Sequence, residues 1–259
     1  MSLKIAANLT MMYNEHDFMD RFAAASRDGF KGVEYLFPYD YPADAIGEQL
    51  ETHGLQQILF DFPAGDWANG DRGIAVQPHR VGEFQDGVGL AIEYAKALGC
   101  QRLTCLAGIP DAGSDPDATD NTLVSNLRFA ADAAAAIDAI VLVEPLNTID
   151  VPGTFVSATA HGQRLIKDTV RDNVRLQFDV YHTQIMEGDL ARKFSRLLPI
   201  IGHVQIADNP GRHEPGSGEI NYPFILEHIG SCGYEGWIGA EYIPASDTKA
   251  GLSWADPYL

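Results

Sequence analysis

The sequence has few cysteines, and they follow no recognisable pattern. Only Cys100, Cys105 and Cys232 are present, without C-x-x-C spacing and in apolar surroundings. An odd number of such residues argues against a disulfide framework and is typical of buried thiols in a reducing compartment. The first residues run directly into a strand-like segment without a signal-peptide pattern, so we expect a cytoplasmic protein.

Basic residues are also scarce, and long hydrophobic runs are missing. The chain carries 18 Lys+Arg against 36 Asp+Glu, a formal net charge of −18, and its basic residues form no cluster. Such a chain repels phosphate backbones and anionic membranes, so we expect neither nucleic acid nor membrane as a partner. The longest apolar candidate, Ala130 to Val143, is broken by Asp132 and Asp138 and falls short of the ~20 residues of a membrane span.

A G-x-G-x-x-G motif after the first strand is missing as well, which weakens the case for an open dinucleotide-binding sheet. What is present is a regular alternation of strand-like and helical segments. The strand-like runs are Lys4–Leu9, Gly32–Phe37, Leu55–Phe62, Arg102–Leu106, Ile140–Leu146, Val174–Val180, Gly202–Ala207 and Trp237–Tyr242. Eight such units in 259 residues predict an α/β fold of the (β/α)8 TIM-barrel type, with residues 1–259 as a single domain.

Helical periodicity fills the intervals between these runs. Two apolar stripes stand out: Phe84, Val88, Ala91, Ala95 and Leu98, which Gly99 would cap, and Leu123, Leu127, Ala130, Ala134 and Ile137. Further helices are predicted over Asp17–Gly29, Ala43–His53, Ser157–Val170, Gln184–Leu198 and Phe224–Cys232. Two polar loops, Pro63–Pro78 and Asp208–Tyr222, each follow a strand, so they should lie on the face where barrel active sites are built.

Polar side chains end four consecutive predicted strands. They are Glu144, Asp179, Gln205 and Glu241. Because adjacent strand ends in a closed barrel lie about 5 Å apart, these three carboxylates and one amide should converge. Like charges at that spacing repel one another unless a cation lies among them, and oxygen ligands suit Mg²⁺ or Mn²⁺ better than zinc. The pattern therefore predicts one divalent metal site.

Each of these residues has a simpler interpretation when taken alone. A single carboxylate at a strand end is more often a helix cap or the ion-pair partner of a loop Lys or Arg. Four in register on neighbouring strands make that reading much weaker. Gln205 is the least secure member, because an amide could simply bridge backbone groups.

Two further side chains could face the same pocket and bind substrate. His182 lies at the start of the loop that leaves the sixth predicted strand, where it could equally be a surface or capping histidine. Arg212 lies in the loop after the seventh strand. It could be a solvated loop charge, but a guanidinium near a metal can also bind a substrate carboxylate.

Four other residues near the strand ends or on the same face are expected to have supporting or structural roles. Glu34 and Asp61 are barrel carboxylates that we expect to support the site or to be ion-paired. His203 is expected to be a hydrogen-bonded core histidine. Trp67, in a Gly-rich loop on the same face, is either a lid over the pocket or a local hydrophobic anchor.

At these positions the sequence resembles the hydroxypyruvate isomerase family of xylose-isomerase-like TIM barrels. The likeness spans nearly the whole chain. The strings that carry it are Ala6–Leu9, Gly32–Tyr39, Val143–Asn147, Phe178–His182, Gly202–Asp208, Gly216–Tyr222, Gly239–Tyr242 and Gly251–Trp254. The resemblance implies a metal-using isomerase without an organic cofactor. It implies Glu144, Asp179, Gln205 and Glu241 as metal ligands, and the two glutamates as the acid/base pair.

The resemblance also implies a reaction. Hydroxypyruvate would be interconverted with tartronate semialdehyde (2-hydroxy-3-oxopropanoate) through a cis-enediolate, with His182 on a substrate oxygen and Arg212 on the substrate carboxylate. Isomerases of 2-oxo-tetronates look similar. Ketose 3-epimerases are a sister group with a histidine where Gln205 stands, which favours the hydroxypyruvate branch.

Two functions outside the isomerases and epimerases are less consistent with the sequence. A phosphodiesterase of the endonuclease IV type would need several zinc-binding histidines and a basic groove, and neither is present in the sequence. A non-catalytic binding barrel would not need two proton-transfer carboxylates. The expected partner is thus a small hydroxy-oxo acid. The oligomeric state stays open, a homo-oligomer included.

Overall fold

The strands close into a barrel. In a computed structural model that describes residues 3–259, eight parallel strands are hydrogen-bonded in sequence order and β8 pairs with β1. Their bounds are β1 Lys4–Asn8, β2 Gly32–Glu34, β3 Gln56–Asp61, β4 Arg102–Cys105, β5 Ile140–Val143, β6 Val174–Asp179, β7 Ile201–Ile206 and β8 Trp237–Ala240. The predicted (β/α)8 barrel is confirmed.

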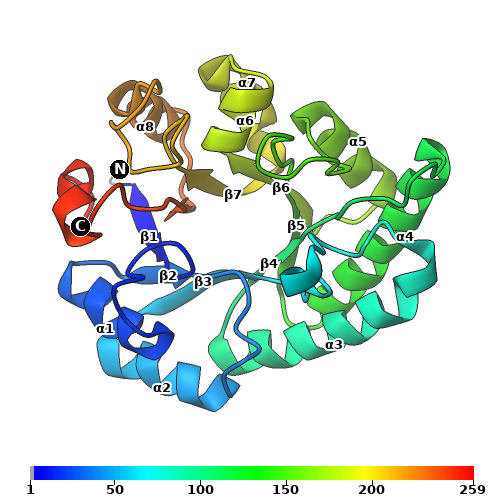
Figure 1. The fold of residues 1–259 in the computed structure, drawn as a ribbon, viewed down its shortest axis with the longest axis horizontal. Coiled ribbons are helices and arrows are strands. Elements are labelled where there is room, and N and C mark those ends of the chain that lie inside the picture. Colours follow the sequence, from blue (N-terminus) through cyan, green and yellow to red (C-terminus); the bar gives the residue numbers. More distant parts are fainter. Residues whose placement is uncertain (1–2) are drawn as a thin grey trace.

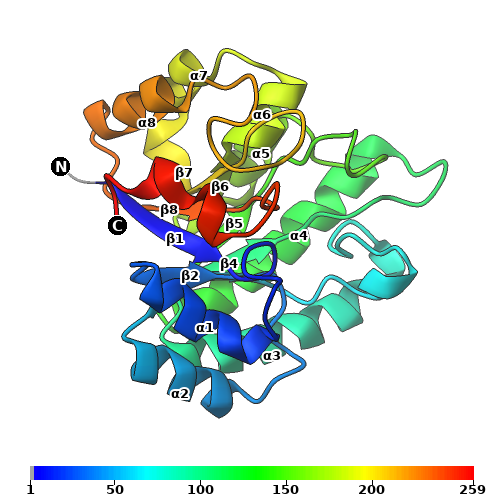
Figure 2. The same cartoon turned by 60° about the vertical axis from the view of Figure 1, so that its left-hand side comes forward.

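Helices surround the strands, as Figure 1 shows down the barrel and Figure 2 from another side. The α-helices are α1 Phe18–Arg27, α2 Ala43–His53, α3 Val81–Leu98, α4 Pro116–Ala135, α5 Thr159–Thr169, α6 Val180–Met186, α7 Leu190–Leu197 and α8 Tyr222–Ser231, and the 3-10 helices are η1 Trp67–Asn69, η2 Pro78–Arg80, η3 Leu198–Ile200 and η4 Lys249–Ala255. The apolar stripe of α3 is buried as predicted, and Gly99 ends that helix in the left-handed conformation at φ 64°. Among residues 3–259 the structure contains no helix both long and apolar enough to cross a membrane.

One predicted helix is wrong in its first half. Instead of a single helix over Gln184–Leu198, the chain forms α6 directly after β6 and then α7. Gly188 and Asp189 break the run, because both adopt positive φ, 63° and 54°. The start of α6 is set by Asp179, whose Oδ1 accepts the backbone N–H of His182 at 3.0 Å. His182 therefore lies in the first turn of a helix and not in a loop.

The strands also end earlier than predicted at the face that carries the polar residues. β5 ends at Val143 and β8 at Ala240, so Glu144 and Glu241 are the first residues beyond their strands. Glu144 precedes Pro145, a position that disfavours helix and keeps the chain extended as it leaves the barrel. Both glutamates thus stand on the rim at the carboxyl ends of the strands.

Candidate active site

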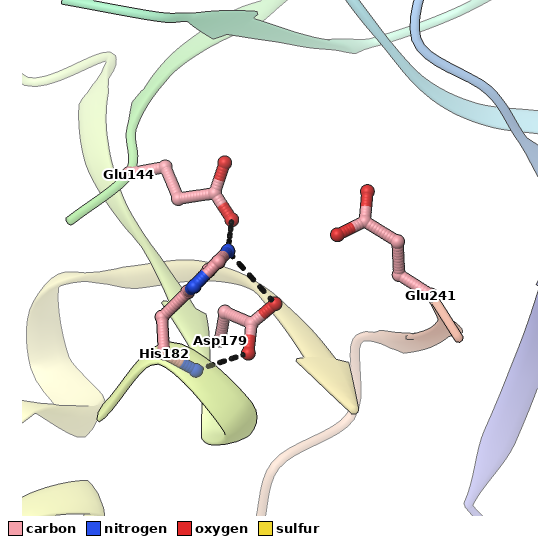
Figure 3. A group of neighbouring side chains, drawn as sticks. All are labelled: Glu144, Asp179, His182 and Glu241. Atoms are coloured by element: carbon pink, nitrogen blue, oxygen red, sulfur yellow. Dashed lines mark hydrogen bonds and ion pairs between the residues drawn. The ribbon is translucent and has the colours of Figure 1, made fainter. Parts of the chain in front are cut away.

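Four ionisable side chains meet at this rim. Glu144, Asp179, His182 and Glu241 are all buried, and one potential ligand atom from each lies within 4.8 Å of the others. Figure 3 shows Glu144, Asp179 and His182 on one side, with the carboxylate of Glu241 facing them from the other. The structure therefore brings together the three carboxylates that the strand-end pattern singled out.

The carboxylates have oxygen atoms that no protein group satisfies. Among residues 3–259, Glu144 Oε1 and Asp179 Oδ2 are buried and have no hydrogen-bond partner. Burial, and then the charges of Glu241 and Asp179, raise the pKa of Glu144 well above its usual range. Burial also raises the pKa of Glu241 to about 8, against the opposing influence of Arg212. Unpaired buried carboxylate oxygens facing one another fit a site for a divalent cation.

His182 is held as a neutral imidazole with its proton on Nε2. Nδ1 accepts the backbone N–H of Asn147 at 3.2 Å and lies 2.7 Å from the Asn147 side-chain amide nitrogen. Two donors at Nδ1 leave the proton on Nε2, which lies 4.0 Å from Glu144 Oε1 and 3.9 Å from Asp179 Oδ2. Burial lowers the pKa of His182 to about 4. Its Nε2–H has no hydrogen-bond acceptor among residues 3–259 and is therefore available to an oxygen atom of a ligand, and in this tautomer His182 is no metal ligand.

Arg212 is largely buried beside Glu241. Its Nη2 donates to Glu241 Oε2 at 2.6 Å, its Nη1 lies 3.8 Å from Asp150 Oδ2, and its guanidinium lies 5.2 Å from the centre of the Tyr181 ring. The residue adopts a positive φ of 54°, which is uncommon for a side chain of this size. Backbone strain at a residue that lines a pocket is consistent with a functional requirement for the position of its side chain.

Gln205 lies next to the carboxylates but presents its nitrogen to them. Nε2 donates to Glu34 Oε1 at 2.8 Å and to Glu241 Oε1 at 3.1 Å. Its Oε1 accepts from Gln177 Nε2 at 2.5 Å, and Gln177 Oε1 in turn accepts from Thr104 Oγ1 at 2.7 Å. Because the amide oxygen points away from the cluster here, the assignment of Gln205 as a metal ligand stays a prediction.

A second layer of buried polar groups supports the rim. Glu34 Oε2 lies 2.7 Å from His203 Nε2, as expected for a hydrogen-bonded core histidine, and this contact holds the Glu34 carboxylate in place. Asn8 Nδ2 donates to both Glu34 Oε1 and Glu241 Oε1, at 3.1 and 3.2 Å. A side chain at Gly239 would collide with the Glu34 carboxylate, so the glycine leaves room for this carboxylate in its observed position. Sequence reasoning gave Asn8 no role, because an asparagine at a strand end carries no specific signal.

A cavity of about 700 Å³, including its open mouth, lies over the carboxylates. Its walls include Asp61, whose pKa is raised well above the usual range by burial and then by the charges of Glu241 and Glu34. Trp67 also lines it and packs edge-on against Phe37, 5.1 Å between ring centres, so it is both an anchor and part of the pocket wall. Arg72 is a lining residue that the sequence analysis missed.

Closed barrels with converging carboxylates at the carboxyl ends of their strands form a broad class of barrel enzymes. This chain belongs to the xylose isomerase-like TIM barrel family, whose model matches residues 22–258. It is 49% identical over 256 residues to the 2-oxo-tetronate isomerase of Cupriavidus necator, covering 99% of this chain and 98% of that one. It is 46% identical to the hydroxypyruvate isomerase of Escherichia coli, covering 99% of both chains. The resemblance inferred from the sequence strings is confirmed.

A solved structure agrees over the full length. The crystal structure described as AP endonuclease, family 2, from Brucella melitensis superposes with a TM-score of 0.97 at 47% identity, covering 100% of this chain and 99% of that one. The E. coli 3-keto-D-glucoside 4-epimerase superposes with a TM-score of 0.79 at 21% identity, which shows a common fold only.

Proposed function

We propose that this protein is an aldose–ketose isomerase that interconverts hydroxypyruvate and tartronate semialdehyde through a cis-enediolate. The observation that carries the proposal is the buried group of Glu144, Asp179 and Glu241 beneath a cavity that also contains arginine side chains. Relatives named hydroxypyruvate isomerase and 2-oxo-tetronate isomerase, both matched over nearly their full length, support it.

The site fits a divalent metal, for which Mg²⁺ or Mn²⁺ is our assignment. Glu144, Asp179 and Glu241 would hold the ion, because two of these carboxylates have unpartnered buried oxygens and all donors are hard. Gln205 is our proposed fourth ligand, and its side-chain amide would have to make a half-turn that gives up the hydrogen bonds from Nε2 to Glu34 and Glu241. When bound, such an ion polarises a carbonyl and stabilises the negative charge of an enediolate.

Glu144 and Glu241 face each other across the site and are our acid/base pair (Figure 3). One carboxylate removes a proton from C3 of hydroxypyruvate, and a carboxylic acid returns a proton to C2. The hydroxyl proton on O3 moves to O2, which leaves an aldehyde at C3. In the metal-free protein burial raises the pKa of Glu241 to about 8, and a bound cation would lower this pKa, so that the ionised carboxylate can act as the base. Asn8 and Arg212 hold Glu241 in place through its two oxygens.

Substrate contacts follow from the remaining donors. His182 would donate its Nε2–H to a substrate oxygen, consistent with its neutral form. Arg212 would contact the substrate carboxylate, since its buried Nε has no hydrogen-bond partner among residues 3–259. A 2-oxo-tetronate carries the same carboxylate and carbonyl with one more hydroxymethyl group, and it is our alternative substrate. A neutral ketose, the substrate class of 3-epimerases, would leave the cationic groups of the cavity unused.

A nucleic-acid phosphodiesterase is less consistent with this chain, although the Brucella melitensis protein is described as an endonuclease. The net charge of −18 opposes a phosphate backbone, and only one histidine belongs to the buried group of ionisable residues in the described part of the chain. We also propose a cytoplasmic location, because Cys100 and Cys105 are buried free thiols.

The direct test is an assay of tartronate semialdehyde formation from hydroxypyruvate, with and without a chelator. We expect turnover by the purified protein, its loss on exhaustive chelation, and its return when Mg²⁺ or Mn²⁺ is added. Circular dichroism should change little between these states. Full activity of metal-free protein would contradict the metal assignment, and no turnover with any divalent metal would contradict the reaction.

A further inference from the structure

The cavity contains two guanidinium groups, which come from opposite sides of the barrel. Arg212 lies in the loop after β7, and Arg72 lies in the loop after β3. In the closed strand order, β3 and β7 are four strands apart in either direction, so these loops leave the barrel at opposite points of its rim. A small anion over the carboxylates can therefore meet positive charge from two directions.

The two arginines differ in how their charge is compensated. Arg212 is paired with Glu241 at 2.6 Å and lies near Asp150. Arg72 forms no ion pair with any carboxylate of residues 3–259, and its hydrogen bonds go to backbone carbonyls only. Glu241 and the nearby Asp150 thus largely neutralise the charge of Arg212, whereas Arg72 brings an uncompensated positive charge to the cavity.

The orientation of Arg72 is fixed by its own loop. Nη1 donates to the carbonyl oxygens of Trp67 and Asp71 at 3.1 and 2.6 Å, and the guanidinium carbon lies 4.3 Å from the centre of the Trp67 ring. This arrangement leaves Nε and Nη2 without a hydrogen-bond partner in the described chain. These two donors lie on one edge of the guanidinium, and a parallel pair of N–H groups matches the two oxygens of a carboxylate.

The loop that carries Arg72 is held by hydrogen bonds and by a close backbone contact. Asp71 Oδ2 accepts from the backbone N–H of Asp66 at 2.6 Å and from Arg80 Nη1 at 2.8 Å. The backbone of Gly73 packs so closely on that of Leu106 that any side chain at this position would collide with it. A donor pair held this firmly binds its ligand with little loss of side-chain entropy.

We propose that Arg72, rather than Arg212 alone, binds the substrate carboxylate and makes the site select hydroxy-oxo acids over neutral ketoses. The inference rests on the proposed function, because it assigns the recognition of that substrate class. Trp67 is then a positioning residue, since it contacts the guanidinium and supports it from one face.

The test compares hydroxypyruvate with dihydroxyacetone, which undergoes the same isomerisation but carries a hydroxymethyl group where hydroxypyruvate has its carboxylate. In Arg72→Met we expect kcat/KM for hydroxypyruvate to fall about 10- to 100-fold, as for a lost charged hydrogen-bond pair, and kcat/KM for dihydroxyacetone to change less than about threefold. Arg192→Met is the matched control, because Arg192 is 85% exposed and, within residues 3–259, pairs only with Asp189. Equal losses on both substrates, or none on either, would overturn the assignment.

Binding provides a readout that does not depend on turnover. D-glycerate, a non-isomerising hydroxy acid, should bind wild type and Arg192→Met with the same Kd and bind Arg72→Met about 10-fold or more weakly. All three proteins should hold the same amount of metal. If wild type fails to isomerise hydroxypyruvate, the proposed function fails, but this comparison still decides the role of Arg72. Equal Kd values for D-glycerate in wild type and Arg72→Met, or no binding by wild type, would refute that role.

Discussion

At the scale of single residues, the chemistry depends on the two glutamates that face each other across the rim. Replacing Glu144 or Glu241 with glutamine keeps the size and one oxygen but removes the proton-transfer group. We expect each variant to lose at least ~10²-fold in kcat, with an unchanged circular dichroism spectrum. Turnover near the wild-type level in either variant would remove that residue from the acid/base pair.

The burial of these glutamates should lower the thermal stability of the metal-free protein at high pH. The pKa of Glu144 is raised in the folded state, mainly by burial, so the folded protein keeps a proton that the unfolded chain releases above about pH 4.5. Raising the pH therefore favours unfolding, and this penalty is absent below that value. In chelator, Glu144→Gln should melt at a higher temperature than wild type at pH 8, with a gain that shrinks towards pH 4.5.

The measurement is a series of thermal melts of both proteins across that pH range, repeated with Mg²⁺. Added metal should reduce or reverse the difference, because it stabilises the ionised carboxylates only in the wild-type site. A pH-independent difference would show that packing, and not ionisation, separates the two proteins.

Residues also differ in how visible their roles are in the sequence. Glu144, Asp179 and Glu241 were predictable because a charged residue at the end of an apolar barrel strand needs a partner. Arg72 and Asn8 were not, because a loop arginine and a strand-end asparagine are common in any sequence. Only the folded chain shows Arg72 lining the cavity and Asn8 between Glu34 and Glu241.

At the scale of elements, the loop between β7 and α8 is organised by one buried carboxylate. Asp208 accepts the backbone N–H groups of Gly216 at 2.8 Å, Gly218 at 2.9 Å and Ile220 at 3.0 Å. These bonds fold the loop back on itself and thereby place Arg212 beside Glu241. The loop was predicted from its polar sequence, but this internal order was not.

Asp208→Asn should therefore damage both stability and catalysis. The asparagine puts an amide N–H against backbone donors, so we expect about 2–4 kcal/mol less free energy of unfolding. Because Arg212 supports Glu241 for any substrate, kcat/KM should fall for hydroxypyruvate and dihydroxyacetone alike. Denaturant titration and the two kinetic assays check this. Asp172→Asn, an exposed site, makes the same change in charge and should leave both measurements unchanged.

Helix boundaries near the site show where sequence patterns were insufficient. The periodicity of Gln184–Leu198 suggested one helix. Asp179 caps α6, which begins four residues before the predicted start and ends at Met186, just before Gly188 with its positive φ. The spacing of apolar residues does not reveal an aspartate that both ends a strand and caps the next helix. The consequence is functional, because this first turn buries His182 beside Glu144.

At the scale of the whole molecule, the alternation of eight strands with helices was enough to predict the closed barrel. The pairing of β1 with β8 joins the first and last strands of the barrel, and both figures show the C-terminal segment beside β1. This supports our proposal that residues 1–259 form one domain. Closure also explains the site, because it brings residues 144 and 241 to one rim.

The overall charge makes a prediction of its own. A protein of net charge −18 repels a singly charged anion at long range, whereas the arginines of the cavity attract it only at close range. Salt screens the long-range field within about 8–10 Å at 0.1–0.15 M but affects partly buried contacts much less. We therefore expect kcat/KM for hydroxypyruvate to rise about twofold between 10 and 150 mM salt. Dihydroxyacetone is neutral, so its kcat/KM should not change in the same buffers. A fall in kcat/KM for hydroxypyruvate would contradict the prediction. It would mean that the arginines of the cavity, and not the acidic surface, dominate the electrostatic field that the substrate meets on approach.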